Sequence, residues 1–471
     1  MLPSSKPSPL PATEAPKERK TSQNLQRIRN GLARKREELI DAIAAGPLGQ
    51  GRNRGEILAS EIIPTLECCQ FLEKEAAKLL RARKIPARKR PLWLAGTKLT
   101  IHREPFGRVL IIGPANYPFF LPISHALHAL AAGNTVLIKP APGCEQVAVL
   151  FAEIVGHPDT VRVTSSDLSE VAACLEKGID LLVFTGGTTA GLAVSGLASR
   201  YGVPVISELS GCDACFVFEK EKLELAARSL VFGLRFNASA TCIAPRRVFV
   251  EHALEEELLN RMKEALTGLQ IPLADKTRDA LLKFLQRAEG AGADLVSGSI
   301  REDAQCAPYL LRLPKEGLSV WQEDLFAPLV TVTSCADVSE ALRLDGECPY
   351  ALGATIFGSS RETRRLSEGV NAGTILLNDM IAPTADPWLP FGARGRSGSG
   401  VTRGAEGLLA MTRPKAIVER RGGSQMYYQP TGRQEHGLLD ELVEIFHTQA
   451  TPRWSRLGLL LRKALEISRS H

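Results

Sequence analysis

The 471-residue chain has no run of about 18 or more consecutive apolar residues, so no segment is predicted to span a bilayer. Its ten cysteines are too sparse and too irregularly spaced for a disulfide scaffold, and no secretory signal with an apolar core is present. We therefore expect a cytoplasmic, reducing environment. The eight histidines show no HxxxH or similar spacing. A CxxC runs from Cys212 to Cys215 without a second ligand pair, so no metal site is expected.

The chain also lacks a strong excess of charge of one sign. It carries 58 basic and 52 acidic side chains, and the net charge of +6 comes entirely from residues 1–55. The remainder is nearly neutral and contains neither a zinc-finger pattern nor aromatic residues interleaved with basic ones. Nucleic acid is therefore not an expected partner. With 44% hydrophobic and 23% charged residues, the composition is that of an ordinary globular protein.

The two ends of the chain differ from its middle. Residues 1–22 are rich in proline, serine and lysine, so they predict a disordered tail. Residues 422–471 begin as a polar linker and continue with apolar residues at helical spacing, from Leu438 to Ile445 and from Leu457 to Leu465, which predicts a helical extension. This extension could attach peripherally to a membrane, although packing against the body or a partner subunit is favoured.

Short β-rich runs alternate with helical runs through the first half of the body. The sequence predicts strands at 108–113, 134–139, 161–165, 181–186 and 203–209, and helices at 121–132, 145–156, 168–177 and 188–200. This alternation favours right-handed crossovers and a doubly wound parallel sheet. A second α/β region follows, with strands expected at 214–218, 246–250, 329–333, 353–357 and 373–378. We assign residues 23–208 and 209–409 to two α/β domains.

Polar and glycine residues collect at the ends of the first set of strands, where ligands of such sheets bind. These ends include Asn116, Lys139, the FTGGTTAG run at 184–191, and Glu208. Both GxGxxG and GxxxxGK[ST] are absent, which excludes a standard Rossmann or P-loop fingerprint. The glycines of FTGGTTAG precede a helix N-terminus that suits a pyrophosphate, although a plain tight turn is the alternative.

A cysteine, a glutamate and an asparagine together indicate acyl-transfer chemistry. Cys242 lies in the small polar run FNASATCIAP, immediately before a strand. Glu208 ends a buried strand, a costly place for a carboxylate unless it is paired or used. Asn116 ends another strand, where its alternative role is that of a turn residue. A nucleophilic sulfur, a base and an amide donor at one sheet edge are the groups that chemistry through a thioester requires.

Six motifs resemble those of the aldehyde dehydrogenase superfamily, in family order. They are EPFGRVLIIGPANYPFFLPISHALHALAAGNTVLIKPAPG, LLVFTGGTTAG, VISELSG, FNASATCIAP, EDLFAPLVTV and LPFGARGRSGSGVTRGAEGLLAMTRPK, and they span roughly residues 100–420. The branch most similar oxidises fatty, aromatic and coniferyl-type aldehydes. The resemblance implies an aldehyde-dehydrogenase-like α/β fold, with a doubly wound cofactor domain (23–208) and a catalytic domain (209–409). It also implies a small β oligomerisation arm from segments near 88–104 and 410–421, and hence a homodimer or homotetramer.

The resemblance also implies roles for individual residues. Cys242 would be the nucleophile, Asn116 the oxyanion donor, and Glu208 the base that activates water to hydrolyse the thioester. NAD or NADP would be the cofactor, bound through Pro114, Lys139, Gly186, Gly187, Gly191, Asp324 and Phe326. Lys139 would hold the adenosine ribose and Phe326 would pack beside the nicotinamide. Pro142 stands where the family often has a glutamate that contacts the ribose 2′-hydroxyl, so both cofactors remain open.

Two alternatives to a hydrolytic dehydrogenase remain. A coenzyme A-acylating or reductive semialdehyde dehydrogenase would share most of these motifs, but such enzymes generally lack the base at Glu208. A catalytically silent family member acting as a binding protein is the second alternative, because Pro142, Gly187, Ser239 and Asp324 depart from the family pattern. The substrate would in each case be a small-molecule aldehyde or its acyl derivative.

Overall fold

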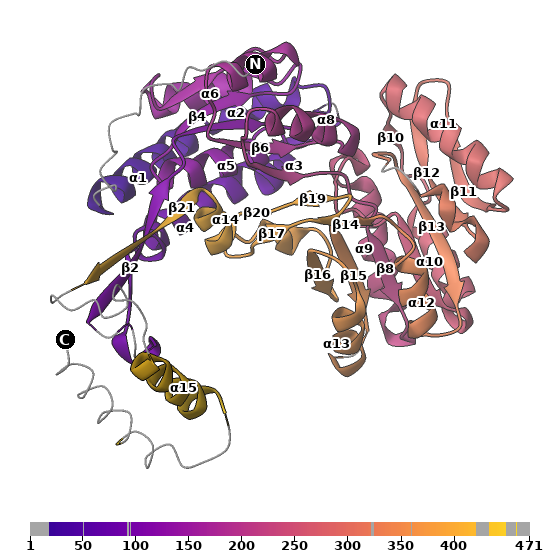
Figure 1. Ribbon diagram of the computed structural model, residues 1–471. Coiled ribbons are helices and arrows are strands. Elements are labelled where there is room, and N and C mark those ends of the chain that lie inside the picture. The colour runs from indigo at the N-terminus through magenta and orange to yellow at the C-terminus, as the bar shows by residue number, and fades with distance from the viewer. Residues whose placement is uncertain are drawn as a thin grey trace. The chain divides into compact units, whose positions relative to one another are not determined.

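The computed structural model (Figure 1) describes residues 18–49, 51–91, 94, 96–321, 325–358, 360–420, 433–448 and 458. The chain divides into two compact units, Met1–Arg83 with Ile101–Lys415, and Lys84–Thr100 with Ala416–His471. The first unit contains both large sheets. Within the described part of the chain, every helix is too short or too polar to cross a membrane.

The chain begins with a helical layer. It comprises α1 (Glu18–Arg34), α2 (Arg36–Ala44), α3 (Arg54–Ile57), a π-helical turn at Leu58–Ile62, and α4 (Ile63–Leu79). Helix α1 starts at Glu18, so the prediction of disorder through residue 22 was wrong for its last five residues. The helix forms because Leu25, Ile28 and Leu32 lie on one face and are buried in the core. Residues 1–17 lie outside the described part of the chain.

The first sheet has six strands in the order β19-β7-β6-β3-β4-β5. Their bounds are β3 (Arg108–Ile112), β4 (Thr135–Lys139), β5 (Val161–Val163), β6 (Leu181–Thr185), β7 (Val205–Glu208) and β19 (Gly398–Ser399). The five strands expected from the sequence are parallel, and the sixth, β19, is antiparallel to β7 and was not expected. The crossover helices are α5 (Phe120–Ala131), α6 (Glu145–Val155), α7 (Ser169–Glu176) and α8 (Thr188–Ser199).

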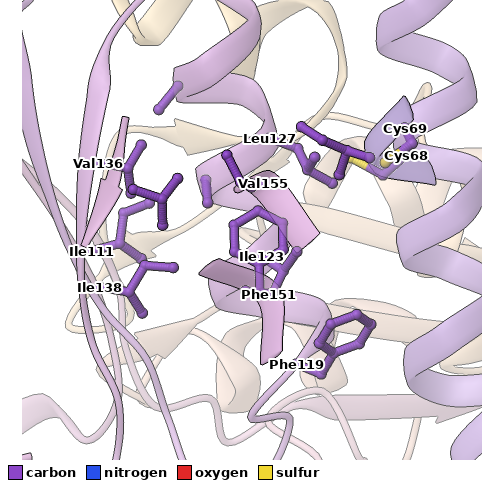
Figure 2. Close-up of a cluster of buried hydrophobic side chains, with 14 of the residues drawn as sticks. Cys68, Cys69, Ile111, Phe119, Ile123, Leu127, Val136, Ile138, Phe151 and Val155 are labelled. Carbon is purple, nitrogen blue, oxygen red and sulfur yellow. The ribbon is translucent and has the colours of Figure 1, made fainter. Parts of the chain in front are cut away.

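Helices cover both faces of this sheet because its strands are apolar on both sides. Alternate residues of a strand point to opposite faces. Val109 and Ile111 therefore join the core shared with α5 and α6, whereas Leu110 and Ile112 join the core with α7 and α8. Figure 2 shows Ile111, Val136 and Ile138 of the sheet beside Ile123, Leu127, Phe151 and Val155 of α5 and α6.

The second sheet has eight strands. Seven follow the order β10-β12-β13-β9-β8-β15-β16, and β11 pairs with β12. Their bounds are β8 (Ala214–Val217), β9 (Arg247–Glu251), β10 (Ile271–Pro272), β11 (Asp294–Ile300), β12 (Gln305–Arg312), β13 (Leu329–Cys335), β15 (Gly353–Phe357) and β16 (Thr374–Leu377). The associated helices are α9 (Leu223–Arg235), α10 (Glu255–Ala265), α11 (Asp275–Gly290), α12 (Val338–Asp345) and α13 (Ser360–Gly369). The five expected strands are all present, and β10, β11 and β12 are additions.

A three-stranded sheet has the order β1-β2-β21, formed by β1 (Arg83–Ile85), β2 (Thr97–Pro105) and β21 (Thr412–Arg420). Two short antiparallel pairs precede β21 in the chain: β14 (Tyr350–Ala351) with β18 (Arg394–Gly395), and β17 (Phe391–Gly392) with β20 (Val401–Thr402). Helix α14 (Gly404–Ala410) follows β20. Helix α15 (Arg433–His447) covers the first expected C-terminal helix, whereas the second, from Leu457 to Leu465, lies outside the described residues apart from Gly458.

Candidate active site

Cys242 follows a strained turn between α9 and β9. Three consecutive residues before it have left-handed backbone conformations without being glycine: Asn237 (φ 52°), Ala238 (φ 49°) and Ser239 (φ 63°). Such conformations typically cost about 1–3 kcal/mol each and persist only where the surroundings enforce them. Cys242 itself is half-buried, whereas eight of the ten cysteines are buried. The strain and the partial exposure distinguish this cysteine from a core residue.

Hydrogen bonds from several elements hold this turn. The buried Arg246 donates from Nη1 to Ser239 Oγ (2.8 Å) and from Nη2 to the Ser239 carbonyl (2.6 Å). Ser239 Oγ donates to the carbonyl of Ala327 (2.9 Å), and the Asn237 N–H donates to Glu56 Oε1 (2.8 Å). The turn is therefore fixed from α3, from the residue just before β9 and from the segment before β13, which explains how it keeps its strained backbone.

Asn116 follows β3 and contacts the same turn. Its side-chain Nδ2 donates to the carbonyl of Ala240 (2.8 Å), and its own carbonyl accepts from Asn237 Nδ2 (2.9 Å). The side chain is 5% exposed. A primary amide has two N–H groups, so the bond to Ala240 orients the amide and leaves the second N–H for another acceptor. The two hydrogen bonds therefore hold Asn116 against the turn that leads to Cys242.

A buried ion pair supports the loop that carries Asn116. Arg52 donates from Nη1 to Glu61 Oε1 (2.8 Å) and from Nη2 to Ser60 Oγ (2.7 Å). Glu61 Oε2 accepts the backbone N–H groups of Phe119 (3.0 Å) and Phe120 (2.8 Å), which begin α5. The carboxylate therefore occupies the positive end of the helix dipole and pairs with a cation, which offsets the cost of burying both charges.

Glu208 ends β7 and is 5% exposed. Its Oε2 accepts a hydrogen bond from Thr402 Oγ1 (3.4 Å), and the next residue, Arg403, is buried with a backbone φ of 61°. Burial raises the pKa of Glu208, and the positive charge of Arg403 and the Thr402 hydroxyl oppose that rise. The raised pKa makes Glu208 a stronger proton acceptor than an exposed carboxylate, which suits a general base.

Arg403 is held by aromatic rings and one carbonyl. Its guanidinium lies 4.4 Å from the ring centroid of Phe391 and 5.4 Å from that of Phe120. Nη1 donates to the carbonyl of Thr384 (2.6 Å). Sequence reasoning missed Arg403, because its local context gives no sign that it lies beside Glu208. Asn237 was also missed, although its place in the polar run before Cys242 was a usable signal.

A cavity of 470 Å³ brings seven of the predicted site residues together. These are Pro114, Asn116, Gly186, Gly187, Glu208, Cys242 and Phe326. Lys276 and Thr277 of α11 also line it and were not predicted. Lys139 and Gly191 are not among its lining residues, and Asp324 lies outside the described part of the chain.

One wall of this cavity, at the start of α8, suits a phosphate-bearing cofactor. A Cβ at Gly187 would meet no atom within 4 Å, so the backbone there is open to a ligand, and no side chain caps the first N–H groups of α8. At Gly191 a Cβ would overlap the side chain of Leu209, so this glycine permits close packing of α8. Lys139 ends β4 and donates from Nζ to the Ser166 carbonyl (2.6 Å). Burial lowers the pKa of Lys139, while Asp167 and Glu145 oppose that change.

A second cavity of 240 Å³ is also lined by Cys242 and Glu208. Its walls include the aromatic side chains of Tyr117, Phe120, Phe232, Phe236 and Phe391. Among the described residues that line it, Arg403 is the one cation and Glu208 the one carboxylate. Cys242 and Glu208 are thus shared by a cavity with an open glycine-rich wall and a cavity with an aromatic wall.

Comparison with known proteins gives the family of the chain. Residues 11–417 match the Aldehyde dehydrogenase family. The chain belongs to this family. As an aldehyde dehydrogenase, it oxidises an aldehyde to a carboxylic acid with NAD or NADP.

Relatives of this aldehyde dehydrogenase cover most of its length. It is 30% identical to a 4,4'-diapolycopene aldehyde oxidase from a Methylomonas species, over 88% of this chain and 78% of the relative. It is 29% identical to the "Probable coniferyl aldehyde dehydrogenase" of Pseudomonas aeruginosa, over 89% and 90%. The solved structure of AldH from Staphylococcus aureus in a substrate-bound state has a TM-score of 0.79 and 25% identity, over 90% of this chain and 94% of that one. These relatives confirm the predicted fold and the predicted branch of the family.

Proposed function

We propose that Cys242, Asn116 and Glu208 carry out a hydrolytic aldehyde oxidation. The observation that carries this proposal is that all three residues line one cavity between the two large sheets. The Cys242 thiolate attacks the aldehyde carbonyl carbon, and the new C–S bond turns the carbonyl oxygen into an oxyanion. The free N–H of Asn116 and the backbone N–H of Cys242 stabilise that charge, a kind of contact worth about 3–4 kcal/mol of barrier.

Hydride loss then converts the thiohemiacetal into a thioester on Cys242. The chemistry that bound NAD(P) would supply is the acceptance of this hydride. Among the described residues, we expect six to hold the cofactor: Pro114, Lys139, Gly186, Gly187, Gly191 and Phe326. Glu208 removes a proton from a water molecule, which attacks the thioester carbon, and the carboxylic acid leaves as the Cys242 sulfur regains its electron pair.

The positive charge of Arg403 gives a testable pH effect. Glu208 must be deprotonated to act, so thioester hydrolysis should rise with pH through the raised pKa of this residue. Arg403→Met removes the charge that opposes that rise, and the acid limb of hydrolysis should move to higher pH. Arg403→Lys keeps a positive charge and should return the limb toward its original position. The measurement is the rate of thioester decay against pH, with thermal unfolding as a check on the fold.

An unchanged acid limb in a folded Arg403→Met enzyme would show that Arg403 does not tune the base. A limb that moves to lower pH would contradict the sign of the effect.

We propose an apolar, aromatic or long-chain aldehyde as the substrate. The support is the aromatic wall of the smaller cavity beside Cys242, and the aldehydes in the names of the relatives. The test follows absorbance at 340 nm with short, long-chain and aromatic aldehydes, with NAD and NADP in parallel. Formation of reduced cofactor without coenzyme A supports hydrolysis. A strict requirement for coenzyme A would favour the acylating alternative. If no mixture gave reduced cofactor, the binding-protein alternative would be favoured.

We also propose that the enzyme is a homodimer or homotetramer. The support is the three-stranded sheet of β1, β2 and β21, in which Ile417 and Val418 are 45% and 61% exposed. Exposed apolar side chains on a short sheet favour pairing with a second copy. Light scattering at micromolar concentration should give a multiple of the chain mass of 51.0 kDa. A monomer under these conditions would contradict the proposal.

We propose a reducing compartment such as the cytoplasm for this enzyme. All ten cysteines are free thiols in the structure, as expected for a protein that is not kept under oxidising conditions.

A further inference from the structure

Two cysteines from distant parts of the sequence meet outside the candidate active site. Cys212 lies in the loop between β7 and β8 and is 1% exposed. Cys348 lies between α12 and β14 and is half-buried. The two thiols share a hydrogen bond, donated by Cys212 to the sulfur of Cys348. The pair therefore joins a partly exposed cysteine, Cys348, to a buried one, Cys212.

Arg247 fixes both segments that carry these thiols. Its Nε donates to the carbonyl of Cys212 (2.9 Å), and its Nη2 donates to Asp345 Oδ1 (2.8 Å). The N–H of Cys348 donates to the carbonyl of Asp345 (3.0 Å). On the other side of the loop, Asp213 Oδ1 accepts the N–H of Gly353 (3.1 Å). The contact between the two sulfurs is thus supported by the backbone on both sides, rather than by two mobile side chains.

The surroundings of Cys348 favour its thiolate. The Cys212 hydrogen bond, followed by the positive charge of Arg247, lowers the pKa of Cys348 to about 6, although burial opposes the change. Burial instead raises the pKa of Cys306 and of Cys335 to about 12. The lowered pKa of Cys348 favours its thiolate, the form that reacts with oxidants, whereas the raised pKa values of Cys306 and Cys335 favour their neutral thiols.

We propose that Cys348 and Cys212 are a peroxide-oxidisable thiol pair that closes to a disulfide. The Cys348 thiolate attacks one oxygen of a hydroperoxide and breaks the O–O bond. This gives a sulfenic acid on Cys348, and the displaced alkoxide or hydroxide takes up a proton. The Cys212 sulfur then attacks the Cys348 sulfur, its proton goes to the departing hydroxyl group, and water leaves. Overall, two thiols are oxidised and one hydroperoxide is reduced to an alcohol and water.

One cysteine of the pair, Cys212, lies in the loop that packs beside Cys242. Cys212 comes four residues after Glu208, and a Cβ at the intervening Gly211 would overlap the carbonyl oxygen of Cys242. A Cys212–Cys348 bond would therefore tether the loop that packs against the main chain of Cys242. The inference does not depend on the roles proposed for Cys242 and Glu208, because its readout is the state of two other sulfurs.

The experiment uses the full chain with Cys242→Ala, which removes the other half-buried thiol and leaves nine of the ten cysteines. The protein is treated with limiting hydrogen peroxide, then denatured, and its thiols are counted. Two thiols should be lost and should return with dithiothreitol. Peptide mapping without reductant should give one cross-linked product that contains Cys212 and Cys348.

Two further variants on this background separate the steps. With Cys348→Ser added, the same dose of peroxide should consume no thiol. With Cys212→Ser added, Cys348 should form a sulfenic acid that dimedone traps, with the loss of one thiol and no cross-link. Should the buried Cys212 variant fail to fold, the cross-link map and the Cys348 variant still decide the matter. Absence of the cross-linked peptide, or equal thiol loss in the Cys348→Ser protein, would overturn the proposal.

Discussion

Replacing Cys242 with alanine is expected to abolish aldehyde oxidation, with a loss on the order of 10⁴-fold or more in turnover. Alanine cannot form the C–S bond, so neither the thiohemiacetal nor the thioester exists. The strained turn before residue 242 is held by Arg246, Asn237 and Ser239, none of which needs the sulfur. The protein should therefore fold normally, and absorbance at 340 nm measures the loss directly.

Cys348→Ala is the matched control, because Cys348 is the other half-buried cysteine and does not line either cavity beside Cys242. Under reducing conditions it should keep nearly full activity. Steady turnover in the Cys242→Ala enzyme would contradict the assignment of the nucleophile.

Replacing Glu208 with glutamine is expected to separate the two halves of the reaction. Glutamine matches the shape of the carboxylate but cannot take a proton from water, so oxidation proceeds and the thioester then accumulates. The enzyme should form about one equivalent of reduced cofactor per site and then slow by about 10²–10⁴-fold, the usual contribution of a general base. Stopped-flow absorbance at 340 nm resolves the burst, and mass spectrometry of the quenched protein should show the acyl group on Cys242.

Glu221→Gln serves as the control for this variant, because Glu221 is an exposed carboxylate in the short 3₁₀ helix Lys220–Lys222 before α9. It should show no burst and normal turnover. Undiminished steady turnover in the Glu208→Gln enzyme would mean that another group activates the water.

The sequence predicted the first sheet well because its signal is local. Runs such as RVLII and LLVFT are apolar on both faces, and a strand between two helical layers requires that pattern. Strand β19 has no such signal, because Gly398 and Ser399 are neither apolar nor β-branched. It forms only because β7 offers an open edge, which depends on the tertiary fold. Likewise, the end of the predicted tail at residue 22 was wrong because burial of Leu25, Ile28 and Leu32 stabilises the whole of α1.

The three reactive groups could be predicted because each has an unusual place in the local pattern. Glu208 is a carboxylate at the end of a buried strand, and Cys242 follows a polar run. The groups that tune and hold them could not be predicted in this way. Arg403 lowers the pKa of Glu208 although the two residues are 195 positions apart in the sequence. Glu61 contacts the start of α5 from a π-helical turn, and no sequence periodicity indicates that turn. Such contacts depend on the assembled fold, so only the structure shows them.

The antiparallel pairing of β19 with β7 also determines when the active site is completed during synthesis of the chain. Gly398 pairs with Glu208, and Thr402 and Arg403 complete the surroundings of that carboxylate. At about 5–20 residues per second, a ribosome needs roughly 10–40 s to add the stretch between Glu208 and Arg403. The nascent chain therefore carries Cys242 well before the base beside it is complete, and a polypeptide released during that interval would have a nucleophile without its finished hydrolytic partner.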